Sequence, residues 1–526
     1  MAAPNTTPIP DLPPELWLEI LYYLPRVAIY KMMCINRLLF NLAMQYKYEE
    51  ICFITDDKGT LRTFEQLHHY ENASRLVRRL YLRPAFLPGM DDTFEDSSVE
   101  DGLGMSQVTS FTWLSDALAF RLKTSPLPHH STDTTAQKAL VAAASGLPRC
   151  TNLREITLII YDHVITPEFR EFLRQLWKRM GPGIQKLTIA TTINKAPDLL
   201  KMVREHSRAL PNLDSLDITI AHSRFPQEKG TAEAATSAIV NLVNKFKKSI
   251  THLTLSASIA FDFSAVLRAL NVIPMLQKLE LWYSTPGSPE LTRFLHAHND
   301  TLEHLVLQPR PRFHCYFSSG SDEILGKWIL SALPTIILPK VKILDVGLQQ
   351  KSRNVYNGIT TPIGPPLPPL LPIFPKLNTL TLTSSFLNLN ELSSVLEVAQ
   401  CQLESLSCHV WTFTPEMLAC LVSKAPRLNR LNLMYDSVEA RDGSAWESTN
   451  AAPDIYTRIQ AVRYPQWPLK YLRIGRRISG GCGQCHPDAY LADLLQHAIS
   501  MDLVVDREME CGCDGRYWSN FYQGRT

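Results

Sequence analysis

The sequence reads Leu276-Gln-Lys-Leu279-Glu-Leu281 at one point and Leu428-Asn-Arg-Leu431-Asn-Leu433 at another, and this recurring stretch decides the fold. Apolar residues occupy its positions 1, 4 and 6. Because positions 4 and 6 are two residues apart, their side chains lie on the same face of an extended strand, and position 5 lies on the other face. The stretch therefore predicts a β-strand with one buried face.

The same pattern recurs along most of the chain. Its copies start at Val77, Leu153, Ile184, Leu213, Ile250, Leu276, Leu302, Val341, Leu377, Leu403, Leu428 and Leu469. Several starts are 25 or 26 residues apart, within the period of about 20 to 29 residues that leucine-rich repeats show. The long gap between Val77 and Leu153 leaves room for one or two weak repeats near Phe111 and Ala139.

The segments between the predicted strands have helical patterns, as at residues 167–180 and 291–298. Strands that alternate with helices form a parallel sheet with right-handed crossovers. We therefore predict an α/β fold over residues 51–475: a leucine-rich-repeat solenoid with a curved parallel sheet and helices outside. The architecture resembles that of leucine-rich-repeat proteins. The repeats lack a regular asparagine at the turn, so we expect them to be irregular.

Residues 11–50 form a separate pattern after a flexible N-terminus at residues 1–10. Leu16, Ile20 and Leu24 have the spacing of an apolar helical stripe, and two further short apolar helices follow. Three such helices make too small a core to be stable alone. They need another surface to pack against, either the repeat array or a partner protein.

This segment resembles the F-box family, in which such a box precedes leucine-rich repeats as a known arrangement. The matching motifs are Leu12-Pro13-Pro14-Glu15-Leu16, Ile20-Leu21, Leu24-Pro25 and Cys34-Ile35-Asn36-Arg37-Leu38-Leu39-Phe40. The resemblance implies docking on a Skp-type adaptor, which joins a cullin scaffold. It implies adaptor contacts at Leu12, Pro13, Leu16, Ile20, Leu24 and Ile29. A helical cap on the edge of the repeat array is the alternative interpretation, and both can hold together.

A protein substrate that binds the unburied face of the strands would meet the outward positions of the repeats. The candidates are Asp217, Thr219, Asp345 and Met434, together with a narrower set of Glu280, Trp282, His409, Trp411, Asn432 and Arg473. The two tryptophans stand out because aromatic anchors often dominate binding energy. Each can instead pack over a loop or against a neighbouring repeat.

Two insertions interrupt the array. Residues 91–101 hold six acidic residues, which indicate a solvated loop or a site for a basic partner. Residues 361–375 are rich in proline, which indicates a stiff loop or a polyproline II segment for an aromatic groove.

Residues 476–526 form a predicted cysteine-rich C-terminal cap. It contains Cys482, Cys485, Cys511 and Cys513. Two pairs of thiolates can hold zinc, but a redox pair and free packed cysteines are also compatible with the spacing. We therefore assign no metal site, leave zinc at these four cysteines open, and predict no cofactor.

Composition narrows the classes of function. With 53 basic and 51 acidic residues the net charge is +2, which disfavours nucleic acid as a partner. No apolar run reaches the roughly 20 residues that span a bilayer, so we expect no membrane partner and a location in the cytosol or nucleus. Neither a phosphate-binding loop nor a nucleophile elbow occurs, so we predict no enzyme activity.

The sequence thus predicts the substrate-recognition subunit of a Skp-cullin-F-box type ubiquitin ligase. Its F-box would dock the adaptor, and its repeats would bind a protein substrate whose identity is unknown. The alternative is a leucine-rich-repeat interaction scaffold without a role in ubiquitin transfer.

Overall fold

The computed structural model describes most of the repeat array and much of the N-terminal helices. The described residues are 13, 15–17, 20, 24, 26–32, 34–35, 37–87, 133–221, 229–257, 261–282, 289–308, 328, 331–347, 372–399, 402–439, 445–446, 458–459, 463–464, 466–477, 485–487, 495, 499 and 504–506. The chain divides into two units. The first comprises residues 1–94, 129–190 and 205–213, and the second comprises residues 95–128, 191–204 and 214–526.

The first unit alternates strands and helices along one sheet. Its strands are β1 (Glu50–Phe53), β2 (Arg79–Leu82), β3 (Glu155–Ile160) and β4 (Lys186–Thr192), and they lie side by side in that order. Its helices are α2 (Arg26–Met32), α3 (Arg37–Tyr48), α4 (Lys58–His69), α5 (Glu71–Ser74), α7 (Asp133–Gly146) and α8 (Pro167–Met180). Short 3₁₀ turns follow at Leu147–Arg149, Gly181–Gly183 and Ser207–Ala209.

One expectation about the first unit is wrong. Because β2 and β3 pair directly in parallel, no additional repeat stands between them in the sheet. Ala139 lies buried in helix α7, and Phe111 is outside the described residues. The weak repeat expected near Ala139 is therefore not a strand of the sheet, because Ala139 lies in a crossover helix.

The second unit continues the same alternation. Its strands are β5 (Ser215–Ala221), β6 (His252–Ala257), β7 (Lys278–Trp282), β8 (His304–Gln308), β9 (Ile343–Gly347), β10 (Thr379–Leu387), β11 (Ser405–Phe413), β12 (Arg430–Glu439), β13 (Ala445–Trp446), β14 (Tyr471–Arg477), β15 (Cys485–Pro487) and β16 (Val504–Asp506). Strands β5 to β12 follow chain order, and β14 pairs with β12. Strands β13 and β15 are antiparallel to their partners.

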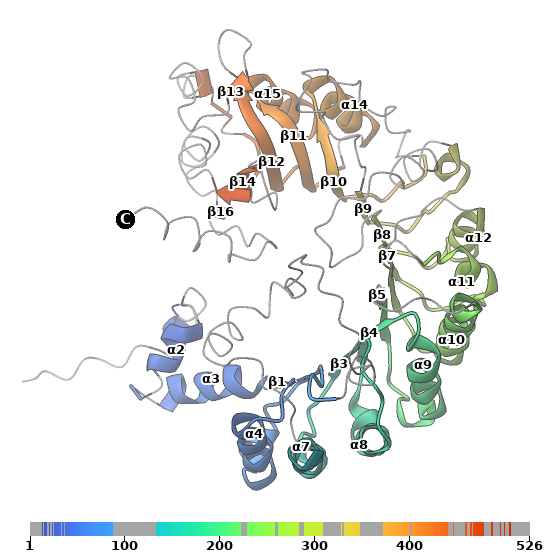
Figure 1. The fold of residues 1–526 in the computed structure, drawn as a ribbon. Coiled ribbons are helices and arrows are strands. Elements are labelled where there is room, and N and C mark those ends of the chain that lie inside the picture. The colour runs from blue at the N-terminus through green and yellow to red at the C-terminus, as the bar shows by residue number, and fades with distance from the viewer. Residues whose placement is uncertain are drawn as a thin grey trace, which may run out of the picture. The chain divides into compact units, whose positions relative to one another are not determined.

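The helices of the second unit lie on one face of its sheet (Figure 1). They are α9 (Ala196–Glu205), α10 (Thr231–Phe246), α11 (Ser264–Ala269), α12 (Pro289–Ala297), α14 (Leu389–Ala399) and α15 (Pro415–Lys424), with a 3₁₀ turn at Leu333–Thr335. Parallel strands with helices between them confirm the predicted α/β leucine-rich-repeat solenoid. The predicted helix at residues 167–180 is also confirmed, as α8.

A ladder of leucines forms the core of the second unit. One leucine from each strand lies directly opposite the next, and none is more than 1% exposed: Leu216, Leu253, Leu279, Leu305, Leu344, Leu380, Leu406, Leu431 and Leu472. These are position 4 of the sequence pattern. Residues two positions later form a second buried row that includes Leu255, Leu281 and Leu307.

Backbone hydrogen bonds join each repeat to the next without using a particular side chain. The carbonyl of Gln277 accepts from the amides of Glu303 and His304 at 2.7 and 2.9 Å. The carbonyls of Glu303, Lys342, Asn378, Glu404 and Asn429 each accept two amides in the same way. Neighbouring repeats are therefore held together by backbone hydrogen bonds, and no regular asparagine in the turn is needed.

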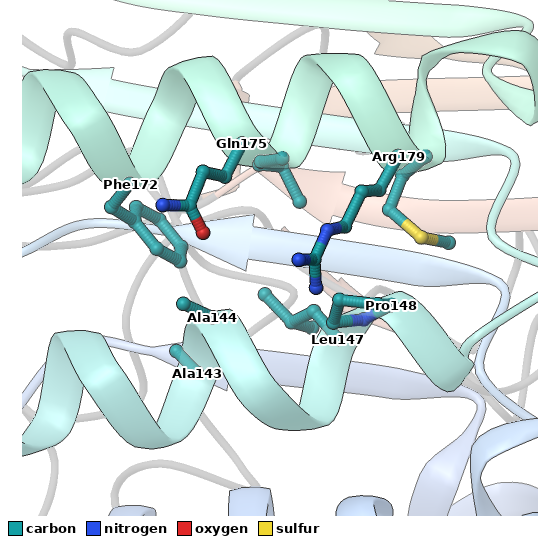
Figure 2. Close-up of a pocket in the computed structure, with 9 residues that line it drawn as sticks. Ala143, Ala144, Leu147, Pro148, Phe172, Gln175 and Arg179 are labelled. Carbon is teal, nitrogen blue, oxygen red and sulfur yellow. The ribbon is translucent and has the colours of Figure 1, made fainter.

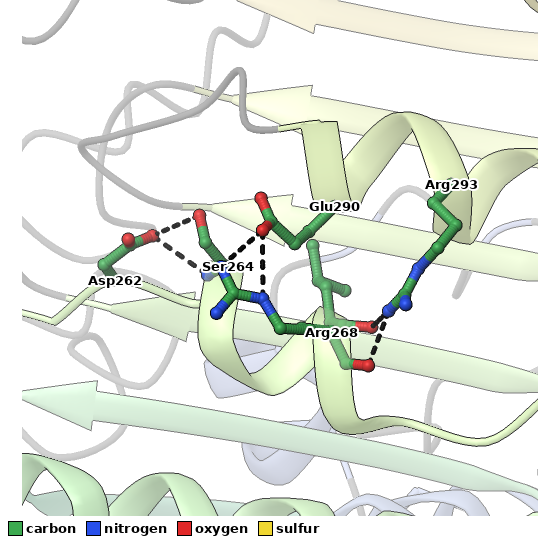
Figure 3. A network of polar contacts seen from close by, with 6 residues as sticks. Asp262, Ser264, Arg268, Glu290 and Arg293 are labelled. Carbon is green, nitrogen blue, oxygen red and sulfur yellow. Dashed lines mark hydrogen bonds and ion pairs between the residues drawn. The ribbon is translucent and has the colours of Figure 1, made fainter.

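Polar contacts also connect adjacent helices on the outer side of the second unit (Figure 3). The Arg268 side chain of α11 donates to Glu290 Oε1 of α12 at 3.0 and 2.5 Å. In return, Arg293 Nη2 of α12 donates to the carbonyls of Leu267 and Arg268 at the end of α11. Arg268 and Arg293 thus form hydrogen bonds that connect α11 and α12, the helices of two neighbouring crossovers.

Helix α8 packs closely on the following turn of the first unit at Gly181. A Cβ atom at this position would collide with the carbonyl oxygen of Ala209, which is backbone and cannot move aside cheaply. We expect Gly181→Ala to lower the free energy of unfolding by about 1–3 kcal/mol, the usual cost of overpacking. Urea denaturation of the full chain measures this.

The matched control is Gly59→Ala in α4, where a Cβ atom would meet only the Asp57 side chain at 3.1 Å. It should leave stability unchanged or slightly raised, since alanine favours helices over glycine. Equal stability of both variants would contradict the close approach at Gly181.

Candidate functional site

The N-terminal helices have a small core of their own. Ile29 of α2 is 1% exposed and packs with Leu39 and Ala43 of α3. Trp17 and Leu24 are partly buried against this cluster. The prediction for Ile29 therefore changes: its side chain holds the helices together and is not a surface contact in this structure.

Large apolar side chains remain exposed around that core. Leu16 is 45% exposed and Ile20 is 39% exposed, and their spacing places them on one side of a helix. Ile35, between α2 and α3, is 61% exposed, and Phe40 of α3 is 47% exposed. Pro13 is exposed as well, whereas Leu12 lies outside the described residues.

The C-terminal end of these helices is joined to the repeat array. Tyr48, the last residue of α3, is 4% exposed, and its hydroxyl donates to Gln66 Oε1 of α4 at 3.0 Å. The Glu49 carbonyl accepts from the amides of Arg78 and Arg79 at the start of β2. The N-terminal segment that ends with Tyr48, called the helical segment below, is thus held at one end. Its exposed apolar side chains are Leu16 and Ile20, Ile35 between α2 and α3, and Phe40 of α3.

A groove between α7 and α8 in the first unit is mostly apolar (Figure 2). It is lined by Ala143, Ala144, Leu147, Pro148, Phe172, Gln175, Leu176, Arg179 and Met180. This lining contains no carboxylate, thiol or imidazole that could act as a catalytic acid, base or nucleophile. We therefore assign the groove to the packing of the two helices.

The second candidate surface is the face of the second unit opposite the leucine ladder, called the polar face below. Because side chains alternate along a strand, Glu280 and Trp282 of β7 point to this face while Leu279 and Leu281 are in the core. Glu280 is 8% exposed and forms an ion pair with Lys278 Nζ at 2.6 Å. The indole Nε1 of Trp282 donates to Glu280 Oε2 at 3.1 Å.

Asp345 of β9 occupies the same register position two strands away. It accepts a hydrogen bond from Gln308 Nε2 of β8 at 2.6 Å. Burial raises its pKa to about 7, and the negative charge of Glu280 adds to this shift, whereas the Gln308 hydrogen bond opposes it. Desolvation of the charged form thus outweighs the one hydrogen bond that stabilises it.

Histidine and lysine flank these carboxylates. His304 lies opposite Lys278 in the register between β7 and β8. Burial lowers the pKa of His304 to about 4, and Lys278 contributes in the same direction. His304 is therefore neutral at physiological pH, and it adds no positive charge to this part of the polar face.

The other residues of the narrower predicted set lie on β11, β12 and β14, four or more strands from Glu280 of β7. His409 and Trp411 are partly exposed on β11. Asn432 of β12 donates to Ser407 Oγ at 3.1 Å and lies opposite Arg473 of β14. At about 4.8 Å between strands, β7 and β11 are roughly 19 Å apart, so the predicted set falls into two groups on one face.

The sequence reasoning missed several residues of the first group: Thr254, Ser256, Lys278, His304 and Gln308. They occupy outward positions of the same repeat pattern, so the alternation of side chains along each strand could have identified them from the sequence. Only the pairing register shows which of them lie next to Glu280 and Asp345.

Other predictions about insertions and metals stay untested. The acidic insertion 91–101, most of the proline-rich insertion 361–375, and Cys482, Cys511 and Cys513 lie outside the described residues, as does the side chain of Cys485. Among described residues, no group of three or more histidine, cysteine, aspartate or glutamate side chains is placed to hold a metal. In the same part of the chain, no helix has the length and apolar character that crossing a bilayer requires.

Comparison with known proteins adds little to this geometry. No protein-family model matches the chain, and no curated protein matches its sequence. Among solved structures, a similar chain comes from the crystal structure of the Rad7 and Elc1 complex in yeast. It is 13% identical, the match covers 76% of this chain and 91% of that chain, and the TM-score is 0.33. A likeness at this level supports no functional inference.

The raised pKa of Asp345 predicts a pH-dependent stability. Between the unfolded value of 3.8 and the folded value of about 7, the folded chain keeps a proton that the unfolded chain has released. The free energy of unfolding therefore falls as the pH rises through this range. We expect Asp345→Asn to be more stable than the wild type by about 1–3 kcal/mol at pH 8, and urea denaturation at several pH values measures this.

At pH 4 most of the advantage of the variant should disappear, since the folded wild-type carboxyl is then protonated and the unfolded carboxyl, with a pKa of 3.8, is only about 60% ionised. An equal difference in stability at pH 4 and pH 8 would show that the Asp345 carboxyl ionises normally.

Proposed function

We propose that this chain is the substrate-recognition subunit of a Skp-cullin-F-box type ubiquitin ligase. In this proposal the helical segment docks a Skp-type adaptor, which joins a cullin scaffold, and the polar face binds a protein substrate. The chain itself would be non-catalytic and would act in the cytosol or nucleus, where such ligases work. The F-box motifs in residues 12–40 and the leucine-rich-repeat fold together motivate this assignment.

The observation that supports adaptor docking best is the exposure of Leu16, Ile20, Ile35 and Phe40 around a separate small core. Burying one such side chain in an interface is worth about 1.5–3 kcal/mol. A helical segment that served only to cover the array would direct its large apolar side chains toward the array. These four side chains are instead exposed, where a partner can contact them.

The C-terminal end of the same helical segment favours a second function, which is to cap the repeat array. The buried Tyr48 and its hydrogen bond to Gln66 tie α3 to the first crossover helix. This contact supports a capping role, as terminal repeats need a cover. A cap and a docking surface are compatible, because they use different residues.

Adaptor binding is tested by truncating two exposed side chains, Leu16→Ala and Ile20→Ala, in the full chain. We expect the double variant to bind a purified Skp-type adaptor at least about tenfold more weakly than the wild type, because each truncation removes an interface anchor. Surface plasmon resonance measures the dissociation constant. Far-UV circular dichroism and urea denaturation verify that the variant is folded.

The matched control is Val272→Ala with Met275→Ala in the second unit, where the side chains are 55% and 51% exposed. It removes similar apolar area outside the helical segment and should bind like the wild type. Failure of the folded wild-type chain to bind the adaptor would exclude the ligase role and leave the scaffold role. Unchanged binding by the Leu16 and Ile20 double variant would exclude this docking surface.

A further inference from the structure

The turn before strand β7 exposes apolar side chains on the second unit. In residues 271–275, called the 271–275 loop, Val272 is 55% exposed and Met275 is 51% exposed. Pro274 between them is exposed as well, whereas Ile273 is fully buried. Ile273 therefore anchors the loop in the core, while its apolar neighbours are in contact with solvent.

Hydrogen bonds from both neighbouring crossovers fix the 271–275 loop. The Asn271 amide donates to Asn244 Oδ1 near the end of α10, and the Ile273 amide donates to His298 Nε2 just after α12, each at 2.9 Å. Pro274 restricts the backbone further, because its ring fixes φ. The exposed apolar side chains are thus held in place before a partner arrives, which lowers the entropic cost of binding.

His298 accepts this hydrogen bond because its ring is neutral. Its Nδ1 lies 2.7 Å from the Phe294 carbonyl and donates to it, since a carbonyl can only accept. Nε2 then has no proton and can accept from the Ile273 amide. Burial lowers the pKa of His298, and the hydrogen bond to Phe294 opposes this shift only in part. The loop is therefore fixed at physiological pH.

Three lysines lie beside the loop at the end of the preceding crossover helix. Lys245 and Lys248 are exposed, and Lys247 is partly exposed. Lys245 follows Asn244 directly, so it is one residue from the contact between Asn244 and Asn271. Within the described part of the chain, none of the three lysines forms an ion pair. Their charges are therefore available to a partner.

Carboxylates are present only on the adjoining turns. Neither residues 244–249 nor the 271–275 loop contains an acidic residue. Asp214 precedes β5, and Asp300 and Glu303 precede β8, where Glu303 is paired with a lysine. The loop thus has three positive charges on its β6 side and the carboxylate of Asp300 on its β8 side. This asymmetry favours a ligand whose acidic groups lie on one side of its apolar groups.

We infer that the 271–275 loop and the three lysines bind an acidic peptide segment of a partner protein other than the adaptor, with large apolar side chains next to its acidic residues. The apolar side chains contact Val272 and Met275, and the acidic residues lie on the side of the lysines. A few apolar anchors carry most of the affinity, and charge complementarity sets the orientation. The inference goes beyond the proposed function, since it holds for a ligase subunit and for a scaffold alike.

The test uses the full chain and the fluorescein-labelled, C-terminally amidated peptide Glu-Asp-Glu-Gly-Leu-Phe, with binding measured by fluorescence anisotropy. We expect saturable binding. Replacing the acidic residues by Gln-Asn-Gln should weaken binding at least about threefold, because charge pairs with the lysines are lost. Replacing Leu-Phe by Ala-Ala should weaken it at least about tenfold, because the apolar anchors are lost.

Two double variants of the protein locate the surface. Val272→Ala with Met275→Ala should lose at least about tenfold in affinity, because both apolar contacts are truncated. Lys247→Gln with Lys248→Gln should lose at least about threefold, because two charge pairs are removed. Urea denaturation of each variant verifies the fold.

The matched controls change exposed side chains of the same kinds before β9 and β10. They are Ile337→Ala, and Lys340→Gln with Lys376→Gln. The two lysines precede strands three and four places from β6, about 14 Å or more away. At 0.15 M salt this exceeds the Debye length of about 8 Å, so both controls should bind the peptide like the wild type.

The inference is overturned by the absence of saturable binding, by equal affinity for either control peptide, or by unchanged binding of either double variant. Self-association is measured by light scattering, because a second copy of the chain is the other occupant that an apolar loop admits. A wild-type dimer that Val272→Ala with Met275→Ala converts to a monomer would identify this occupant and would also overturn the inference.

Adaptor binding is measured on the same preparations. Leu16→Ala with Ile20→Ala should lose the adaptor and keep the peptide, whereas Val272→Ala with Met275→Ala should lose the peptide and keep the adaptor. Loss of the adaptor by the latter variant would show that the adaptor occupies the loop, and this inference would fall. If the adaptor binds and the peptide does not, only this inference fails; if the peptide binds and the adaptor does not, only the ligase role fails.

Discussion

The structure depends on the register of its parallel strands. In the second unit this register places a leucine of each strand opposite a leucine of the next, and all of them are buried. A slip of one residue would turn the ladder toward the polar face. The paired amides that bind one carbonyl before each strand fix the register through the backbone. For this reason the array tolerates irregular turns and insertions of different length.

The same register builds the polar face. Stacking the leucines at one position necessarily stacks the residues between them, so side chains from distant parts of the sequence form rows. Asp217, Glu280 and Asp345 share one register position in this way, with Thr254 and Val306 on the strands between them. The low dielectric near the sheet then acts on the row, and it keeps the pKa of Asp345 far above that of an exposed aspartate. The arrangement of the polar face thus follows from the requirement that positions 4 and 6 be buried.

The helical segment depends on the repeat array for its stability. Its core of Ile29, Leu39 and Ala43 is too small to be stable alone, and Tyr48 fastens one end of the segment to α4. Fixing the segment at one end leaves other apolar side chains exposed. The attachment to the array and the exposed apolar side chains therefore have the same origin, because the segment needs the array for stability and still leaves Leu16 and Ile20 exposed.

The sequence by itself determined the repeat, the strand faces and the helices, because a spacing of two between buried leucines permits only one way to bury them. It also located the helical segment through its apolar stripe. Only the tertiary structure decided that Ile29 is internal, that β2 pairs directly with β3, and that Gln308 of β8 donates a hydrogen bond to Asp345 of β9. Pairing register and burial join residues far apart in the chain, and no local spacing specifies which residues these are.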